Sequence, residues 1–117
     1  EAMRHEQQYR DAKGRFFGID LTDGKIHVRV LESIEQFRQE GEAMHHCVFT
    51  NEYYRRDDSL ILSATMDGKR LETVEVSLSR LKVAQSRGVC NEDSPYHKQI
   101  IKLVQHNIHL IENRLTA

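Results

Sequence analysis

Alternating apolar and polar residues form the first regular pattern in the chain. Phe17, Ile19 and Leu21 alternate with their neighbours, which is typical of a strand that buries one face. An Asp-Gly pair follows at 23–24, where both residue types tolerate the positive φ that a tight hairpin turn requires. The alternation then resumes, so the pattern predicts a β-hairpin over residues 16–31.

Three further strands are predicted in the second half of the chain, over residues 60–66, 71–78 and 81–87. The first is a dense apolar run, and a second Asp-Gly pair separates it from the next strand. On the last strand, every second side chain shares a face. Gln85 and Arg87 are therefore predicted to lie on the same face as Leu81 and Val83.

Helical spacing occurs between the hairpin and this meander. Ser33 and Gln36 have the form of a capping box, and one helical stripe follows: Ile34, Phe37, Gly41 and Met44. Glycine is unfavourable inside a helix by about 1 kcal/mol relative to alanine. We therefore expect Gly41 to separate a first short helix from a second one that carries residues 45–47.

A longer helix is predicted at the end of the chain. Ser94 and Pro95 form a helix start, because proline at the first helical position loses no intrahelical hydrogen bond. The apolar residues that follow fall within one narrow arc of a helical wheel: Ile100, Val104, Ile108, Ile111 and Leu115. Such a helix requires an apolar surface, which the predicted sheet supplies.

These elements predict an α+β domain with an antiparallel sheet of about five strands, formed by a hairpin and a meander. Two short helices and a C-terminal amphipathic helix complete it. The domain is expected to span residues 14–117. Residues 1–13 are polar and rich in helix formers, and they are predicted to be the tail of a preceding helix in a larger parent protein.

Composition narrows the class of protein. With 117 residues, 38% apolar and 30% charged, the chain can fold as one domain without disulfides or metal. The formal net charge of −1 gives no overall attraction to nucleic acid or to a membrane surface. No apolar run approaches the roughly 18 residues of a membrane span. Without a secretory signal, we expect a cytoplasmic protein with no membrane contact, in which Cys47 and Cys90 are thiols.

Candidate chemistry is concentrated in three consecutive residues, His45, His46 and Cys47. A thiolate is a strong nucleophile once a helix N-terminus or a nearby imidazolium lowers the pKa of the thiol. His46 and Cys47 are therefore the candidate catalytic residues. The alternative is that Cys47 is a buried, inert residue and His46 a hydrogen-bonded structural histidine.

A zinc site is a further alternative for the same residues. Zinc takes about three or four protein ligands, usually at recognisable short spacings. Histidine and cysteine donors are present at five positions of interest: His45, His46, Cys47, Cys90 and His97. No Cys-x-x-Cys or His-x-x-x-His pair occurs among them. We therefore predict no metal and no other cofactor.

The strand that ends at Arg87 carries a second group of candidates. An amide at Gln85 and a guanidinium at Arg87, on a face predicted to be apolar, require partners because a buried unpaired charge is costly. They either line a cleft at the end of the sheet or pair with an acid such as Glu75. Gly88 follows, and it permits the backbone to turn sharply toward a ligand.

Several of these segments together resemble the PcfJ-like domain family. The resemblance covers roughly residues 15–110 and rests on residues 41–48, Tyr53, residues 59–63, residues 83–88 and Asn91. The family tyrosine falls at Tyr53 or Tyr54. The family has no established biochemical activity. Its members are encoded largely by bacterial plasmids, conjugative elements and prophages, which implies a cytoplasmic domain associated with the remainder of a larger protein.

We therefore predict a ligand-binding or catalytic cleft formed by His46, Cys47, Gln85, Arg87 and Asn91. Three further ligand-binding candidates flank it: His45, Tyr53 and Gly88. Three function classes are compatible with this cleft: a thiol enzyme, a module that binds nucleic acid or an anionic small molecule, and a structural interaction domain. Thiol reactivity favours the first class, salt-sensitive binding to DNA or RNA the second, and an inert buried Cys47 the third.

Overall fold

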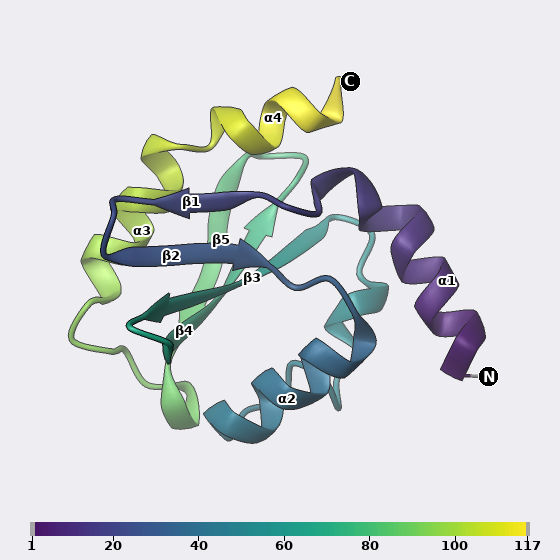
Figure 1. Ribbon diagram of the computed structural model, residues 1–117, viewed down its shortest axis with the longest axis horizontal. Coiled ribbons are helices and arrows are strands. Elements are labelled where there is room, and N and C mark those ends of the chain that lie inside the picture. The colour runs from purple at the N-terminus through teal and green to yellow at the C-terminus, as the bar shows by residue number, and fades with distance from the viewer. Residues whose placement is uncertain (1, 117) are drawn as a thin grey trace.

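Each strand of the sheet pairs with the strand that precedes it in the sequence, in the spatial order β1-β2-β3-β4-β5 (Figure 1). The computed structural model describes residues 2–116. Its strands are β1 (Asp20–Thr22), β2 (Ile26–Val30), β3 (Ser59–Met66), β4 (Lys69–Ser77) and β5 (Lys82–Arg87). All four pairings are antiparallel, which confirms the predicted five-stranded sheet and the α+β class.

Helices lie on both faces of this sheet. The α-helices are α1 (Ala2–Lys13), α2 (Ile34–Met44), α3 (His97–His106) and α4 (His109–Leu115). Short 3-10 helices are η1 (Gly14–Phe16), η2 (Tyr53–Arg55) and η3 (Val89–Asn91). No helix within residues 2–116 combines the length and the apolar character that crossing a bilayer requires.

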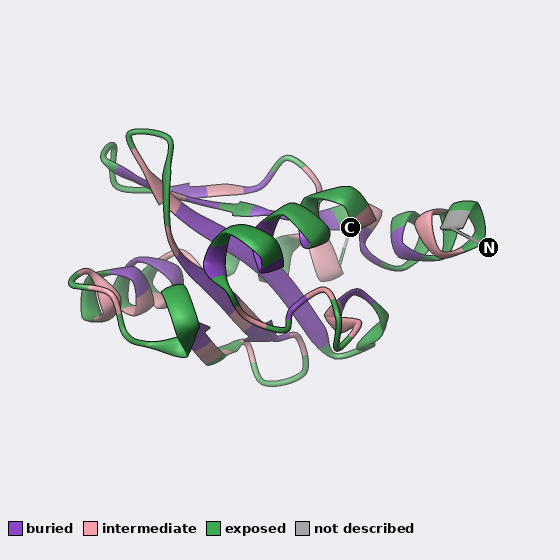
Figure 2. Cartoon of the chain, turned by 90° about the horizontal axis from the view of Figure 1, so that it is seen from below, coloured by how far each residue is buried: buried purple, intermediate pink, exposed green. Residues whose placement is uncertain are grey.

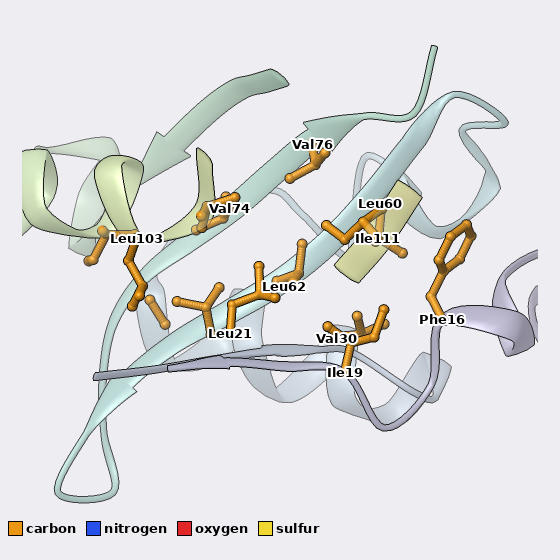
Figure 3. Packing of buried hydrophobic residues seen from close by; sticks show 14 of the residues in the cluster. Phe16, Ile19, Leu21, Val30, Leu60, Leu62, Val74, Val76, Leu103 and Ile111 are labelled. Atoms are coloured by element: carbon orange, nitrogen blue, oxygen red, sulfur yellow. The ribbon is translucent and has the colours of Figure 1, made fainter. Parts of the chain in front are cut away.

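The main hydrophobic core lies between the sheet and helices α3 and α4 (Figure 3). Its members include Leu60, Leu62, Val74, Val76, Leu103 and Ile111. Within each strand these residues are two positions apart, so they point to one face of the sheet. Burying a side chain of this size contributes about 1.5–3 kcal/mol relative to leaving it exposed. This face therefore supplies most of the hydrophobic stabilisation.

A second, smaller hydrophobic cluster lies on the opposite face of the sheet, beneath α2. It contains Tyr9, Leu31, Phe37, Val48, Tyr54 and Ile61. Phe37 of α2 is at its centre, with edge-on contacts to two tyrosine rings at centroid distances of 5.3 and 5.6 Å. Strand β3 is thus covered on both faces, and most of its length appears as a buried, purple strand in Figure 2.

Helix α1 packs on the edge of this second cluster. The Tyr9 hydroxyl donates a hydrogen bond to the carbonyl of Leu31. Lys13 Nζ donates to the carbonyls of Arg56 and Ser59 at 2.8 and 2.6 Å. Residues 2–13 are therefore helical as expected and are attached to the sheet by specific contacts. Their origin in a larger parent protein stays a prediction.

The predicted hairpin over residues 16–31 is too long at its N-terminal end. Residues 14–16 form η1, and β1 begins only at Asp20. The reason is the tight turn around Phe17, whose N–H donates to the carbonyl of Gly14 at 3.1 Å, followed by Gly18 at φ +89°. This turn places the Phe16 ring in the main core rather than on a strand (Figure 3).

The predicted break at Gly41 is wrong, because α2 continues through it to Met44. One of the two hydrogen bonds of the predicted capping box is present, because the Ser33 hydroxyl accepts the Gln36 N–H at 3.1 Å. Gly41 is buried against the returning chain, where an added Cβ would lie 3.2 Å from the carbonyl oxygen of His46. Glycine therefore serves close packing here, and the expected second short helix is replaced by a turn.

The C-terminal helix also departs from the prediction. It starts at His97, after a turn in which the Ser94 hydroxyl accepts the N–H of Tyr96, so Pro95 precedes the helix. The helix is interrupted at Asn107, whose side-chain amide donates to the carbonyl of Leu103 at 2.9 Å. Just after it, backbone hydrogen bonds span three residues in place of four, from the Ile108 N–H to the Gln105 carbonyl at 3.4 Å and from the Leu110 N–H to the Asn107 carbonyl at 3.0 Å. The predicted single helix is thereby divided into α3 and α4.

The predicted face for the end of β5 is wrong as well. Register shifts by one residue between the pairs Glu75–Gln85 and Val76–Val83, which marks a β-bulge. Val83 therefore packs toward the main core, while Gln85 continues on the opposite face beside Glu75. A bulge inverts the inward and outward alternation, and periodicity alone does not reveal it.

Glu72 anchors the loop that follows β5. Its carboxylate is fully buried and accepts hydrogen bonds from the hydroxyl of Ser86, the N–H of Ser94 at 2.8 Å and His97 Nδ1 at 2.9 Å. Burial raises the pKa of the Glu72 carboxyl, but these hydrogen bonds outweigh burial and hold the pKa below its usual value. The loop that carries Asn91 is thereby tied to β4, β5 and α3.

Replacing Glu72 with Gln is expected to lower the free energy of unfolding by about 1–3 kcal/mol, because a charged acceptor of three hydrogen bonds is lost. Since the folded-state pKa of Glu72 is depressed, its stabilisation is complete above the unfolded pKa of about 4.3 and is lost as pH falls through the folded value. Urea denaturation at neutral and acidic pH measures both effects. Glu92→Gln, an exposed carboxylate in the same loop, is the control, and an equal loss in both variants would contradict this role.

Candidate functional site

The chain reverses direction immediately after α2. His45 ends the helix in the left-handed conformation at φ 53° and is exposed. The next residues fold back through hydrogen bonds from the N–H of Asn51 to the carbonyl of Cys47, at 2.8 Å, and from that of Tyr53 to Val48, at 3.1 Å. His46 and Cys47 are consequently held in a turn against the sheet, with Val48 buried beneath them.

This turn and the end of β5 enclose a cavity of about 300 Å³. The cavity is lined by His46, Cys47, Val48, Asn51, Tyr53, Ile61, Thr73, Glu75, Gln85, Arg87 and Asn91. All five residues of the predicted cleft and the candidate Tyr53 are among them. Tyr54 is a buried member of the cluster beneath α2, whereas Tyr53 packs against that cluster and also lines the cavity.

Two candidate ligand-binding residues, His45 and Gly88, do not line this cavity. Gly88 has φ −88°, which any residue adopts. An added Cβ there would lie 2.7 Å from the carbonyl oxygen of Glu92 and 3.1 Å from that of Leu71. The glycine is therefore required for close backbone packing in the loop after β5, and no ligand is needed to explain it.

His46 is the end of a chain of hydrogen bonds that reaches into the protein. Its Nε2 lies 2.8 Å from Thr73 Oγ1, and the Thr73 hydroxyl donates to the carboxylate of Glu40. Glu40 is 1% exposed and also accepts from Ser63 Oγ and Arg70 Nε, each at 2.9 Å. A carboxylate from α2 is thus bound by three side chains of the sheet.

This chain of hydrogen bonds sets the tautomer of His46. The single Thr73 hydroxyl proton is directed to Glu40, so Thr73 Oγ1 accepts a hydrogen bond from a protonated His46 Nε2. His46 Nδ1 is then the acceptor, consistent with the Val48 N–H that approaches it at 3.4 Å. Burial lowers the pKa of His46 below its usual value, and the negative charge of Glu40 only partly opposes this shift.

The opposite wall of the cavity contains a guanidinium with weak partners. Among residues 2–116, Arg87 makes two polar contacts, both from Nη1: the carbonyl of Ser86 at 3.5 Å and Asp93 Oδ1 at 3.4 Å. These distances lie at the long end of hydrogen bonding. The side chain is 43% exposed. Arg87 does not pair with Glu75, the acid suggested from sequence, and so retains donors that face solvent or a ligand.

Neutral polar groups complete the cavity. The side-chain amides of Asn51, Gln85 and Asn91 and the hydroxyl of Tyr53 make no hydrogen bond within the described part of the chain. The exposed Cys47 thiol is likewise free, as is that of Cys90 outside the cavity. No group of three or more potential metal ligands occurs within residues 2–116. The available groups therefore suit hydrogen bonding to a small polar molecule.

Three residues that matter at this site were not predicted from the sequence, Glu40, Asn51 and Thr73, and Glu75 was suggested only as an acid that could pair with Gln85 or Arg87. Glu40 occupies the position before Gly41 and reads as an ordinary charged helix residue, because its buried contacts come from a sheet formed by later residues. Thr73 and Glu75 alternate with buried valines, so the sequence indicates only that both lie on the face of the sheet opposite the valines. Asn51 carries no sequence signal beyond its place in a polar turn.

A protein-family model matches the chain over most of its length. The family model of the PcfJ-like protein matches residues 1–101. The chain belongs to the PcfJ-like protein family. This PcfJ-like match includes α1, the turn after α2, the whole sheet and the loop that carries Asn91. Neither a curated protein nor a solved structure matches the chain.

The partial burial of His46 predicts a pH effect on stability. The folded-state pKa of His46 is lowered, so the unfolded chain takes up a proton at about pH 6.5 that the folded chain does not. This contribution to stability is therefore complete above this pH, falls as the pH is lowered from there toward the folded value, and levels off below it. We expect the loss of unfolding free energy between about pH 7.5 and 5.5 to be smaller in His46→Gln. His106→Gln, at an exposed histidine, is the matched control, and identical pH profiles for wild type and His46→Gln would contradict the assignment.

Proposed function

We propose that this PcfJ-like domain binds a small anionic ligand in the cavity between the turn after α2 and the end of β5. The observation that carries this proposal is the half-exposed guanidinium of Arg87, which has only long intramolecular contacts and lines a cavity with three unengaged side-chain amides. A planar guanidinium binds carboxylate and phosphate groups through two parallel hydrogen bonds. The amides supply additional donors.

A larger hollow of about 650 Å³ on the same side of the sheet offers a useful contrast. Its two arginines are already paired: Arg29 Nε lies 3.3 Å from Asp20 and Arg70 Nε lies 2.9 Å from Glu40. Its remaining acid, Glu32, accepts the backbone N–H of Gly18 at 2.8 Å. The buried Asp20 Oδ1 accepts no hydrogen bond from the described residues, but a carboxylate oxygen repels an anion. Volume alone therefore does not favour this hollow for an anionic ligand.

Inorganic phosphate is expected to raise the thermal midpoint of the wild-type protein and to shift the amide resonances of residues that line the cavity. Arg87→Gln should abolish both effects. Arg87→Lys should weaken binding about tenfold, or roughly 1.4 kcal/mol, because the planar fork is replaced by a single ammonium. Arg80→Lys, an exposed arginine after β4, is the control. Binding unchanged in Arg87→Gln would refute the proposal.

A second candidate function, thiol catalysis by Cys47, is favoured by one observation. The exposed Cys47 thiol and the neutral His46 line the same cavity, with His46 oriented by Thr73 and Glu40. With its Nε2 proton bound to Thr73, His46 has Nδ1 as its basic nitrogen, and the only hydrogen bond to Nδ1 within the described residues is the long one from the Val48 N–H at 3.4 Å. If Cys47 is the nucleophile, it lies in the same cavity as the bound ligand.

Saturating inorganic phosphate is expected to slow alkylation of Cys47 by iodoacetamide while leaving Cys90 unaffected. Both thiols are exposed, but Cys47 lines the cavity and Cys90 does not. Peptide mass spectrometry over a time course gives both rates in the same sample, so Cys90 is an internal control. Cys47→Ala should keep the fold and the phosphate response. Equal protection of the two thiols, or of neither, would contradict a shared compartment.

The resemblance also supports a biological setting, which we propose with the anion-binding function. The domain is expected to act in the bacterial cytoplasm, as part of a larger protein encoded by a plasmid, conjugative element or prophage. In that setting, a phosphate of nucleic acid is one source of the anionic group, and a free small molecule is the other. Binding of single-stranded DNA that weakens steeply with salt and is lost in Arg87→Gln would favour that source over a free small molecule.

A further inference from the structure

Glu75 places a second charged group on the floor of the same cavity. In the β4–β5 ladder, Glu75 is opposite Gln85, and Thr73 is opposite Arg87. The acid and the guanidinium therefore lie on the same face of the sheet, in residue pairs separated by the single pair Val74–Ser86. Both line the cavity, and among residues 2–116 they form no ion pair with each other: Glu75 pairs with Arg56 at 3.2 Å and Arg87 with Asp93 at 3.4 Å. The site thus presents two opposite charges that do not neutralise each other.

The hydrogen bonds of Glu75 are confined to one of its oxygens. Oε2 accepts the Ser59 hydroxyl at 2.6 Å and Arg56 Nη1 at 3.2 Å. Arg56 is itself held in place by the Tyr53 ring, with Cζ 3.6 Å from the ring centroid. The other oxygen, Oε1, accepts no hydrogen bond from the described residues, and it is not enclosed by protein. The carboxylate is fixed, and its open acceptor remains accessible.

We propose that the ligand of this cavity is bipolar, with an anionic group bound by Arg87 and a protonated amine bound by Glu75 Oε1. The inference rests on the anion-binding function proposed above and deepens it by naming the class of ligand. An ammonium group supplies the hydrogen bond that Oε1 lacks and carries the charge that complements a carboxylate. Small aminocarboxylates and aminophosphates both have this chemistry.

Burial of Glu75 makes the amine a determinant of specificity. Its side chain is only 13% exposed, so a bound ligand removes most of the remaining water from Oε1. An anion without an amine would leave this acceptor unpaired, which is costly in a desolvated site. The cavity, at about 300 Å³, lies at the small end of the range for ligand sites and accommodates a molecule of this kind.

Two matched pairs of probes test the inference on the whole chain: β-alanine against propionate, and phosphoethanolamine against ethyl phosphate. Within each pair the anionic group is the same and only the amine differs. Titrations followed by amide resonances of the cavity residues are expected to show about tenfold or tighter binding of the amine-bearing member. The pair that binds more tightly identifies the anion as carboxylate or phosphate.

Glu75→Gln is expected to remove this preference while retaining binding of propionate or ethyl phosphate through Arg87. Circular dichroism verifies that the variant is folded, and Glu92→Gln is the exposed control. Equal binding of both members of each pair to the wild type would overturn the bipolar ligand but leave anion binding intact. Binding of none of the four probes would overturn the anion-binding function itself. A preference that persists in Glu75→Gln would also overturn the assignment, because Glu75 would not be its source.

Discussion

The buried carboxylate of Glu40 is the contact on which the cavity depends. It comes from α2, yet all three of its hydrogen-bond donors belong to β3 and β4: Ser63, Arg70 and Thr73. A charge at 1% exposure is tolerated only with such partners, so α2 has one favourable position on the sheet. That position determines where α2 ends and where the following turn begins. The orientation of His46, through Thr73, follows from the same contact.

A second buried carboxylate has an equivalent effect on the other side of the cavity. Glu72, from β4, binds β5, the loop after it and the start of α3, and so determines where the loop that carries Asn91 lies. Adjacent residues on β4 point to opposite faces, so Glu72 serves one face while Thr73 contacts His46 on the other. The two walls are therefore held by acids on separate elements. The cavity between the two walls contains side-chain amides that make no hydrogen bond within the described part of the chain.

The sequence by itself determined most of the secondary structure and the candidate residues. Two Asp-Gly turns and the alternation around them specify an antiparallel sheet, because turn chemistry and side-chain period are local properties. The grouping of His46 and Cys47, and the polar end of β5 at Gln85 and Arg87, indicated two candidate groups of site residues. Local patterns were sufficient for these predictions, since each depends on residues only a few positions apart.

Tertiary structure alone decided how those groups meet. Gly41 favours a helix break by propensity, but packing against the returning chain keeps α2 continuous. The bulge opposite Glu75 moves Gln85 and Arg87 off the face that Val83 occupies and onto the face beneath α2. Glu40 and Glu75 acquire their roles from partners between 16 and 33 residues away. Such roles come from long-range desolvation and hydrogen bonding, whereas propensity and periodicity describe neighbours along the chain.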